Sequence, residues 1–360
     1  ALSEAFVVGV YQGFGNGGFD EQMLASLTDE AIFTHPGRGI TTITEARSNP
    51  ADIGWVNGTL SWNNMYARIR AANIAISKLS DPNYPNKGAQ ADRLLGEAKF
   101  LRACYSHQLL RYYGGFPIVD SPYTLDAETF ELPRNTFEEC VNFIVKDLDE
   151  SAALLAGKSN IRGRANEVAA LALKSRVLLY AASDLHDGPT AKAKSSLHAS
   201  FSNLEILAYP SGNRIERWQK AQAAAKAVLD KTTGNQMGLS EPVSFEQGVQ
   251  NYINNSMARN GGEKEIILGR YFINAKQENG GRQGLFNGPN GYNNWAGNTP
   301  VQNLIDDYEM MDGTKFDWNK PSHAATPYQN REPRFYASVL YDGAQWKPRS
   351  SANQARDPRG

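Results

Sequence analysis

The chain has 360 residues, which is enough for one large domain or two ordinary ones. Its 37 basic and 38 acidic side chains leave a net charge of -1, so the overall charge does not draw the chain toward nucleic acid or an anionic membrane surface. No apolar run approaches the roughly 18 residues that a membrane-spanning helix needs. The two cysteines form no C-x-x-C pair, which excludes a zinc ribbon.

The first predicted helices form a pair, over residues 59–79 and 91–113. In both, apolar residues recur three and four positions apart, which indicates one buried face on each helix. Gly114 and Gly115 follow the second helix and predict its C-terminal cap. Two amphipathic helices joined by one loop are predicted to pack against each other.

A second pair is predicted over 136–156 and 165–184, with Asn135 as the cap of its first helix, and another helix over 217–230. Paired helices of this kind are typical of a tetratricopeptide-like helical-repeat solenoid, although no strict period is present and a generic helical bundle stays open. Small residues are predicted where helices pack closely: Ala98, Ala103, Ala169, Ala172, Ala221 and Ala225. The predicted fold is therefore mainly α.

Beyond residue 230 the helical periodicity fades and Gly and Asn become frequent. Short β-type runs appear at 265–272 (EIILGRYF) and 335–343 (FYASVLYDG). We predict a helical-repeat part over about 1–230 and a layer of long loops and short strands over about 231–360. Because this layer reads as an elaboration of the solenoid, a single domain over 1–360 is predicted.

Several segments carry a family pattern. WNNMYARIRAANIAISKL (62–79) is similar to W-x-x-x-Y-x-x-I-x-x-A-N, and GEAKFLRACYSHQLLRYYGGFPIV (96–119) to E-A-(R/K)-F-L-R-A followed by Y-G-G-(V/I/F)-P. ALALKSRVLLYAA (170–182) is similar to A-x-x-x-K-A-R-x-x-L-Y-A. TPVQNLIDDYEMMDG (299–313) and NREPRFYASVLYDGAQW (330–346) resemble P-x-x-x-L-V-D-x-Y-x-M-x-D-G and N-R-D-P-R-F, with Glu332 in place of Asp. In this order they resemble the SusD/RagB family of surface glycan-binding lipoproteins of Bacteroidetes.

The resemblance implies a function. It implies non-catalytic binding of an oligosaccharide or polysaccharide at the cell surface and its delivery to a SusC-like TonB-dependent outer-membrane transporter, without a cofactor or metal. Attachment to the outer membrane would use an N-terminal lipid that is not present in this chain. The family usually continues with further helices beyond the last motif, so C-terminal helices are expected to be missing here.

The charged motif residues are predicted to hold the fold rather than bind a ligand. Glu97 and Arg102 lie five residues apart and do not share a helix face, and Glu97 is predicted nearer the surface. Arg331 and Arg334 flank Pro333 and are predicted to bind carboxylates or backbone carbonyls between the two layers.

Enzymatic signatures are weak. GFGNGG (13–18) matches G-x-G-x-x-G but lacks the acidic residue about 20 positions on, so a glycine-rich turn is predicted. None of the histidines falls in a metal-ligand pattern, and His107 is predicted as a buried histidine beside an apolar helix face. A glycosidase needs two facing carboxylates, which a sequence does not reveal.

The segment NGPNGYNNWAGNTP (287–300) presents large aromatics among amides. Sugars offer apolar C–H faces and hydroxyl edges, which flat rings and Asn side chains complement. The resemblance further implies ligand contacts in this loop and in SNPADIGWVNGTLSW (48–62). The predicted ligand-binding residues are Trp295, Tyr292, Asn293, Asn294, Trp55, Asn57, Phe286 and Asn298. For each aromatic, a packing anchor for a long loop stays open.

Two other functions stay open. One is a helical-repeat scaffold that binds a protein through its polar loops and binds no glycan. The other is a glycoside hydrolase.

Overall fold

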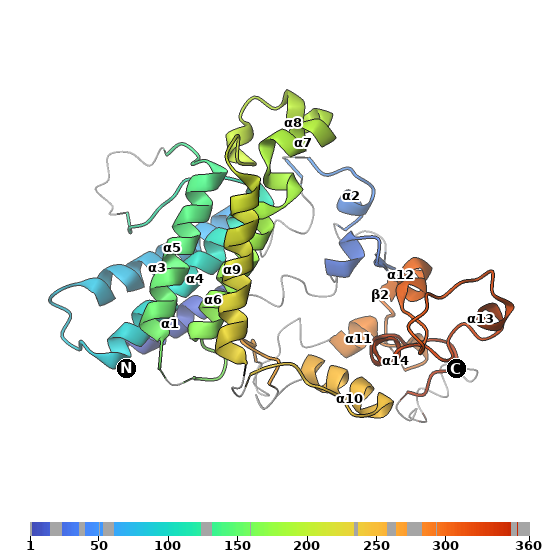
Figure 1. Cartoon of the computed structure of the whole chain (residues 1–360). Coiled ribbons are helices and arrows are strands. Elements are labelled where there is room, and N and C mark those ends of the chain that lie inside the picture. Colours follow the sequence, from blue (N-terminus) through green and yellow to red (C-terminus); the bar gives the residue numbers. More distant parts are fainter. Residues whose placement is uncertain are drawn as a thin grey trace. The chain divides into compact units, whose positions relative to one another are not determined.

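The fold is described from a computed structural model of the chain (Figure 1). The structure describes residues 2–14, 24–35, 40–49, 51–52, 61–123, 132–158, 160–233, 237–257, 264–271, 283–292, 294–346 and 351. It divides into two compact units, which we call the helical unit (Ala1–Phe14, Leu60–Gly238 and Ile267–Arg270) and the loop unit (Gly15–Thr59, Leu239–Ile266 and Tyr271–Gly360). Over the described ranges the fold is mainly α, as the sequence predicts.

The helical unit is a side-by-side array of long helices. They are α3 (Trp62–Ser80), α4 (Ala89–Tyr113), α5 (Phe137–Leu155), α6 (Glu167–Ala182) and α9 (Arg214–Thr232). Each packs against the next one in this order (Figure 1), which is the arrangement of a helical-repeat solenoid. The predicted tetratricopeptide-like fold is thereby confirmed.

Shorter elements complete the helical unit. α1 (Leu2–Val10) packs on α3 and α4 and is followed by η1 (Tyr11–Phe14). Between α6 and α9 lie η4 (Asp184–His186), α7 (Gly188–Lys194), α8 (Ser196–Ser200) and η5 (Leu204–Ile206). Of the glycine-rich turn predicted at 13–18, only Gly13 and Phe14 are among the described residues.

Small side chains let the helices approach closely. Ala98 and Ala103 are fully buried on α4, and Ala169 and Ala221 are buried on α6 and α9, as predicted. Ala225 is exposed instead, because it lies on the face of α9 that turns away from α6. The packing prediction is therefore correct for the inner faces of the array and wrong at the outer face of α9.

Local signals set the helix ends. Gly114 ends α4 with a φ of 75°, a left-handed conformation that glycine adopts without strain. Thr136, not Asn135, caps α5: its side chain accepts from the N–H of Glu139, whose carboxylate accepts in return from the N–H of Thr136 (2.8 Å). The Asn135 side chain instead accepts from the N–H of Ile118 (2.9 Å). The Asn135 prediction is wrong because a long-range contact occupies its amide oxygen.

Glu97 is fully buried, so its predicted surface position is wrong. Its carboxylate binds Arg93 (2.6 Å), Arg164 (2.5 Å) and the hydroxyl of Tyr11 (2.8 Å). These three partners compensate the cost of burying the charge. Arg102 lies on another face of α4 and pairs with Asp147 of α5 (2.6 and 2.7 Å).

The loop unit contains α2 (Thr41–Thr44), α10 (Phe245–Ser256), α11 (Gln283–Asn287), α12 (Gln302–Asp307), α13 (Pro321–Ala325) and α14 (Pro333–Ser338). It also holds η2 (Leu24–Leu27), η7 (Asn290–Tyr292), and the two-stranded sheet of β1 (Ala31–Phe33) and β2 (Asn298–Pro300). α10 packs against α14.

The two strands predicted from β-type runs are wrong. Residues 333–338 form α14, because Pro333 at its first turn has the backbone angle of a helix start. The described part of the other run, 265–271, contains no strand. Arg331 is buried and donates to the carbonyl oxygens of Pro327 (2.8 Å), Tyr308 (2.7 Å) and Ile305, so it binds backbone carbonyls as predicted. All three carbonyls belong to the loop unit, as does Glu332, whose carboxylate binds Arg334 (2.5 and 2.7 Å). The predicted position of the two arginines between the two layers is therefore wrong.

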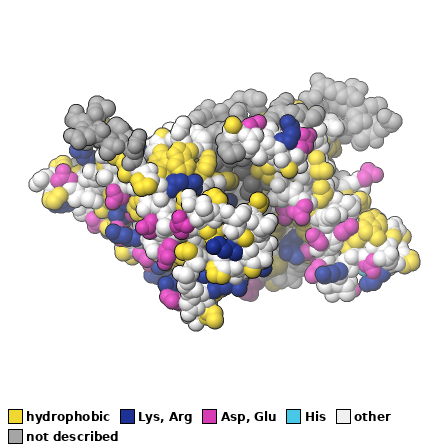
Figure 2. Space-filling model, turned by 90° about the horizontal axis from the view of Figure 1, so that it is seen from above, with side chains coloured by type: hydrophobic (Ala, Val, Ile, Leu, Met, Phe, Trp, Pro, Cys, Tyr) yellow, Lys and Arg dark blue, Asp and Glu magenta, His cyan; other side chains and the backbone are white. Residues whose placement is uncertain are grey.

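Acidic and basic side chains are interspersed on the face shown in Figure 2. Neither sign forms a continuous patch there, in agreement with the near-zero net charge. None of the described helices has the length and hydropathy of a membrane span.

Candidate functional site

The polar segment 287–300 is anchored by the sheet. β2 pairs antiparallel with β1 in the register Ala31 with Pro300, Ile32 with Thr299 and Phe33 with Asn298. Beyond the sheet, the N–H of Thr34 donates to the carbonyl of Gly297 (2.7 Å). A segment that lacks an apolar stripe of its own thus gains a fixed position from backbone hydrogen bonds to a strand more than 260 residues away.

The same segment folds back on α11. The N–H of Trp295 donates to the carbonyl of Leu285 (2.8 Å), and the N–H of Gly297 to that of Phe286 (2.6 Å). The N–H of Ala296 donates to the carbonyl of Gly288 (3.0 Å). Ala296 has a φ of 46°, a left-handed conformation that a non-glycine residue adopts only when its surroundings enforce it. The backbone from Trp295 to Gly297 is therefore tightly constrained.

Trp295 lies between two other rings and is partly exposed. Its ring centroid is 5.2 Å from that of Phe286 and 5.8 Å from that of His35, which it meets edge to face. His35 in turn makes an edge-to-face contact with Phe33 (5.5 Å). Packing on two sides fixes the orientation of the indole, while its partial exposure leaves surface for another molecule.

Amide side chains surround this aromatic cluster. The amide nitrogen of Asn298 donates to the side-chain oxygen of Asn287 (2.5 Å), and its oxygen accepts from the hydroxyl of Ser26 (2.8 Å). Asn294 is partly exposed, and its amide approaches Gly288 so closely that a Cβ at this glycine would collide with it. Asparagines in this setting present fixed donors and acceptors.

His35 is the residue that the sequence did not single out as a ligand contact. Its Nε2 is buried and has no hydrogen-bond partner among the described residues. A buried polar atom without a partner costs free energy, so such an atom beside a partly exposed indole is a candidate contact for a hydroxyl group. In the sequence it stands as an isolated histidine, and no motif marks it.

The predicted site residues divide into three groups. Trp295, Tyr292, Asn294 and Asn298 are partly exposed and lie on the one short segment. Phe286 is 5% exposed and packs beside Trp295. Asn293, Trp55 and Asn57 lie outside the described residues.

Metal ligands are not concentrated anywhere in the described ranges. No group of three or more His, Cys, Asp or Glu side chains that could hold an ion occurs there.

Comparison with known families identifies the chain. A family model described as "Starch-binding associating with outer membrane" matches residues 19–179, and a model described as "SusD family" matches residues 255–358. Together these ranges cover more than two thirds of the sequence. The chain belongs to the SusD/RagB family.

One curated protein is similar in sequence, and solved structures are similar in fold at low identity. The SusD-like protein P38 of Formosa agariphila is 29% identical over 121 residues, which are 34% of this chain and 23% of P38. A SusD-like protein of Bacteroides fragilis has a TM-score of 0.69 at 22% identity and covers 96% of this chain. Surface glycan-binding protein A of Bacteroides fluxus has a TM-score of 0.57 at 18% identity and also covers 96%. The chain spans 61% and 65% of the length of these two solved proteins.

Proposed function

We propose that the chain binds an oligosaccharide or polysaccharide without breaking a bond, and that the segment around Trp295 contacts the sugar. The observation that carries this proposal is the partly exposed indole of Trp295, fixed between Phe286 and His35 and surrounded by amides. An immobilised flat ring can stack on the apolar face of a sugar without losing rotamer freedom on binding.

The proposed sugar-binding residues would make two kinds of contact, stacking and hydrogen bonding. Trp295 and Tyr292 would supply the stacking faces, and Asn294, Asn298 and the buried Nε2 of His35 would form hydrogen bonds to hydroxyls. Phe286 would support Trp295 from within. Asn293, Trp55 and Asn57 remain proposed contacts from the sequence.

The composition of the segment around Trp295 fits binding better than catalysis. The segment 286–300 contains no Asp or Glu, whereas a glycosidase needs two carboxylates beside the scissile bond. Membership of a family that is described as starch-binding points the same way.

The family also supports the cellular setting. The matching model is described as associating with the outer membrane, so we propose a surface lipoprotein that passes its ligand to a SusC-like TonB-dependent transporter. We further propose that both units belong to one SusD-like domain over 1–360, because a solved relative aligns with 96% of the chain.

A protein-binding scaffold is the second candidate. The outer face of α9 leaves Ile215 and Leu229 more than 60% exposed and Trp218 40% exposed. Apolar side chains clustered on one helix face are a common feature of protein interfaces.

The test is affinity electrophoresis of the 360-residue chain through gels that contain amylopectin, laminarin, arabinoxylan or pectic galactan. We expect retardation by at least one polysaccharide. Trp295→Ala should weaken that binding at least about tenfold, equal to about 1.4 kcal/mol, because it removes the stacking face.

Trp318→Ala is the matched control, since Trp318 is 46% exposed in the same unit but lies outside the segment. It should bind as the wild type does. Unchanged binding by Trp295→Ala would overturn the site. Retardation by none of the polysaccharides would favour the scaffold, and release of reducing sugar would favour a hydrolase.

A further inference from the structure

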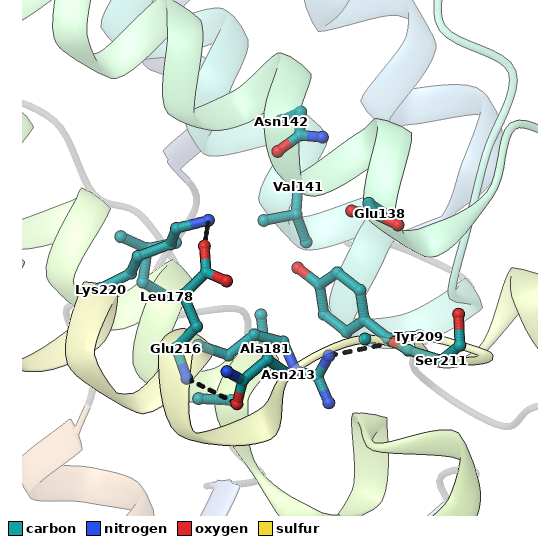
Figure 3. A pocket seen from close by; sticks show the side chains of 13 residues that line it. Glu138, Val141, Asn142, Leu178, Ala181, Tyr209, Ser211, Asn213, Glu216 and Lys220 are labelled. Carbon is teal, nitrogen blue, oxygen red and sulfur yellow. Dashed lines mark hydrogen bonds and ion pairs between the residues drawn. The ribbon is translucent and has the colours of Figure 1, made fainter.

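A second concave site lies in the helical unit. A pocket of about 340 Å³ opens between α5, α6 and α9, and the segment that leads into α9 borders it (Figure 3). This volume is at the lower end of the range of small-molecule sites, which begins near 300 Å³. All of its lining residues belong to the helical unit, and none belongs to the segment around Trp295.

The floor of the pocket is apolar and rigid. Val141 of α5 and Ala181 and Ala182 of α6 are buried in the helix packing, and Leu178 contributes a partly exposed side chain. Because these residues lie on the facing sides of two packed helices, the floor is preformed. Most of its exposed apolar surface therefore comes from Leu178.

Tyr209 forms one wall, and its hydroxyl points into the pocket (Figure 3). Its ring contacts Phe137 edge to face (5.5 Å), and the guanidinium of Arg217 lies 4.6 Å from the ring centroid. The hydroxyl forms no hydrogen bond within the described part of the chain. Burial, and then the carboxylate of Glu138, raise the pKa of Tyr209 to about 12, so the hydroxyl keeps its proton and can donate.

Arg217 provides a second unused donor. It pairs with Asp187 and donates to the carbonyl of Ser211 (3.2 Å), yet its Nε is buried and without a partner among the residues that the structure describes. A buried guanidinium N–H without an acceptor is costly, so an acceptor on a bound molecule would relieve that cost.

The rim of the pocket carries both hydrogen-bond donors and hydrogen-bond acceptors. Glu138 and Asn142 lie one turn apart on α5, and Glu216 of α9 pairs with Lys220 (2.9 Å). Lys220 is paired with Glu216 and Arg217 with Asp187, and Glu138 adds one further carboxylate, so the rim disfavours an anion. A neutral ligand with several hydroxyls would use both kinds of group.

We propose that this pocket binds a single neutral sugar ring, with one apolar face against Val141 and Leu178 and its hydroxyls on Tyr209 and Asn142. This proposal depends on the proposed function in one respect, which is that the ligand is a sugar. The pocket would then be a subsite for one sugar unit on the helical unit, distinct from the loop segment that receives the polymer.

The test uses saturation-transfer NMR and calorimetric titration of the 360-residue chain with D-glucose, D-galactose, D-mannose, D-xylose and L-arabinose. At least one sugar should bind. Tyr209→Phe removes only the hydroxyl and keeps the ring packing, and Asn142→Ala removes an exposed amide. Each should weaken binding at least about fivefold, the usual effect of one hydrogen bond.

Tyr112→Phe is the matched control, because Tyr112 is a partly exposed tyrosine of α4 outside the pocket. It should bind the sugar as the wild type does. The proposal is overturned if no sugar binds, or if Tyr209→Phe and Asn142→Ala both keep full affinity while circular dichroism shows them folded.

Different outcomes would overturn the pocket proposal and the proposed function. Loss of monosaccharide binding in Trp295→Ala, with full binding in Tyr209→Phe, would place the sugar on the loop segment and overturn the pocket alone. Monosaccharide binding that depends on Tyr209, in a chain that no polysaccharide retards, would uphold the pocket and overturn the proposed function.

Discussion

At the scale of single residues, buried charges connect distant parts of the helical unit. Glu97 is fully buried, and its carboxylate joins α4 to η1 through Tyr11 and to the segment before α6 through Arg164. Arg93 and Arg164 also reach Glu4 of α1 (2.9 and 3.4 Å). A buried carboxylate with this many partners is stable only while all of them are present.

Glu97→Ala is therefore expected to destabilise the chain by about 3–5 kcal/mol, because Arg164 would lose its buried partner and keep only the longer contact with Glu4. Urea unfolding followed by circular dichroism measures the change. Asp149→Asn removes a carboxylate whose pair with Lys174 is half exposed, and it should cost less than about 1 kcal/mol. Equal losses in both variants would contradict a special role for Glu97.

The sequence motif marks Glu97 but does not reveal its burial. Its partner Arg164 is 67 residues away, and helical periodicity reports only on neighbours within a few turns. The same limit explains the cap of α5. Asn135 and Thr136 are both good caps in sequence, and a contact with Ile118 decides between them.

At the scale of elements, backbone pairing and a small aromatic cluster together hold the segment around Trp295. β1 and β2 hold one end, and the hydrogen bonds from Trp295 and Gly297 to α11 hold the other. Gly297 sits where a Cβ would lie 2.7 Å from the carbonyl oxygen of Phe286 and 3.3 Å from the ring of Phe33. This close approach permits only glycine.

Gly297→Ala is expected to displace the segment and with it the indole of Trp295. Polysaccharide binding should fall at least about tenfold, equal to about 1.4 kcal/mol, in the electrophoresis assay. Gly284→Ala is the matched control, since a Cβ at Gly284 of α11 meets nothing within 4 Å, and it should bind normally. Normal binding by Gly297→Ala would show that the segment does not need this geometry.

Elements differ in how far their sequences predict them. The long helices follow from a repeated apolar spacing, which is a local property of the chain. The run at 335–343 alternates like a strand, yet Phe335 is buried in a cluster with Tyr308 and Tyr341, and Pro333 starts a helix there. Tertiary packing overrides strand propensity in so short a segment.

At the scale of the whole molecule, burial changes the protonation of two histidines. His107 is 3% exposed on α4, and burial, followed by the charges of Arg111 and Arg176, lowers its pKa to about 3. Burial also lowers the pKa of His186. Both imidazoles are therefore neutral in the folded chain at neutral pH, and His107 is confirmed as a core histidine.

Because the folded pKa of His107 lies below the value of about 6.5 for an exposed histidine, unfolding takes up a proton between these values. We expect the contribution of His107 to be fully present above pH 6.5. It should decline by about 1.4 kcal/mol for each pH unit as the pH falls toward 3.

His107→Gln should make the decline in the free energy of unfolding shallower between pH 6 and 4, as measured by urea titrations at several pH values. Between pH 7 and 8 the two curves should run parallel, which serves as the internal control. Parallel curves throughout would show that His107 does not bind the extra proton.

The sequence by itself determined the helical-repeat fold, the family and the polar, aromatic character of the loop. These depend on periodicity and on short motifs, which neighbouring residues carry. Tertiary structure alone decided that Glu97 is buried, that His35 lies beside Trp295 and that Tyr209 borders a pocket on α5, α6 and α9. Each of these depends on which distant segments meet, and that is set by the packing of the whole chain.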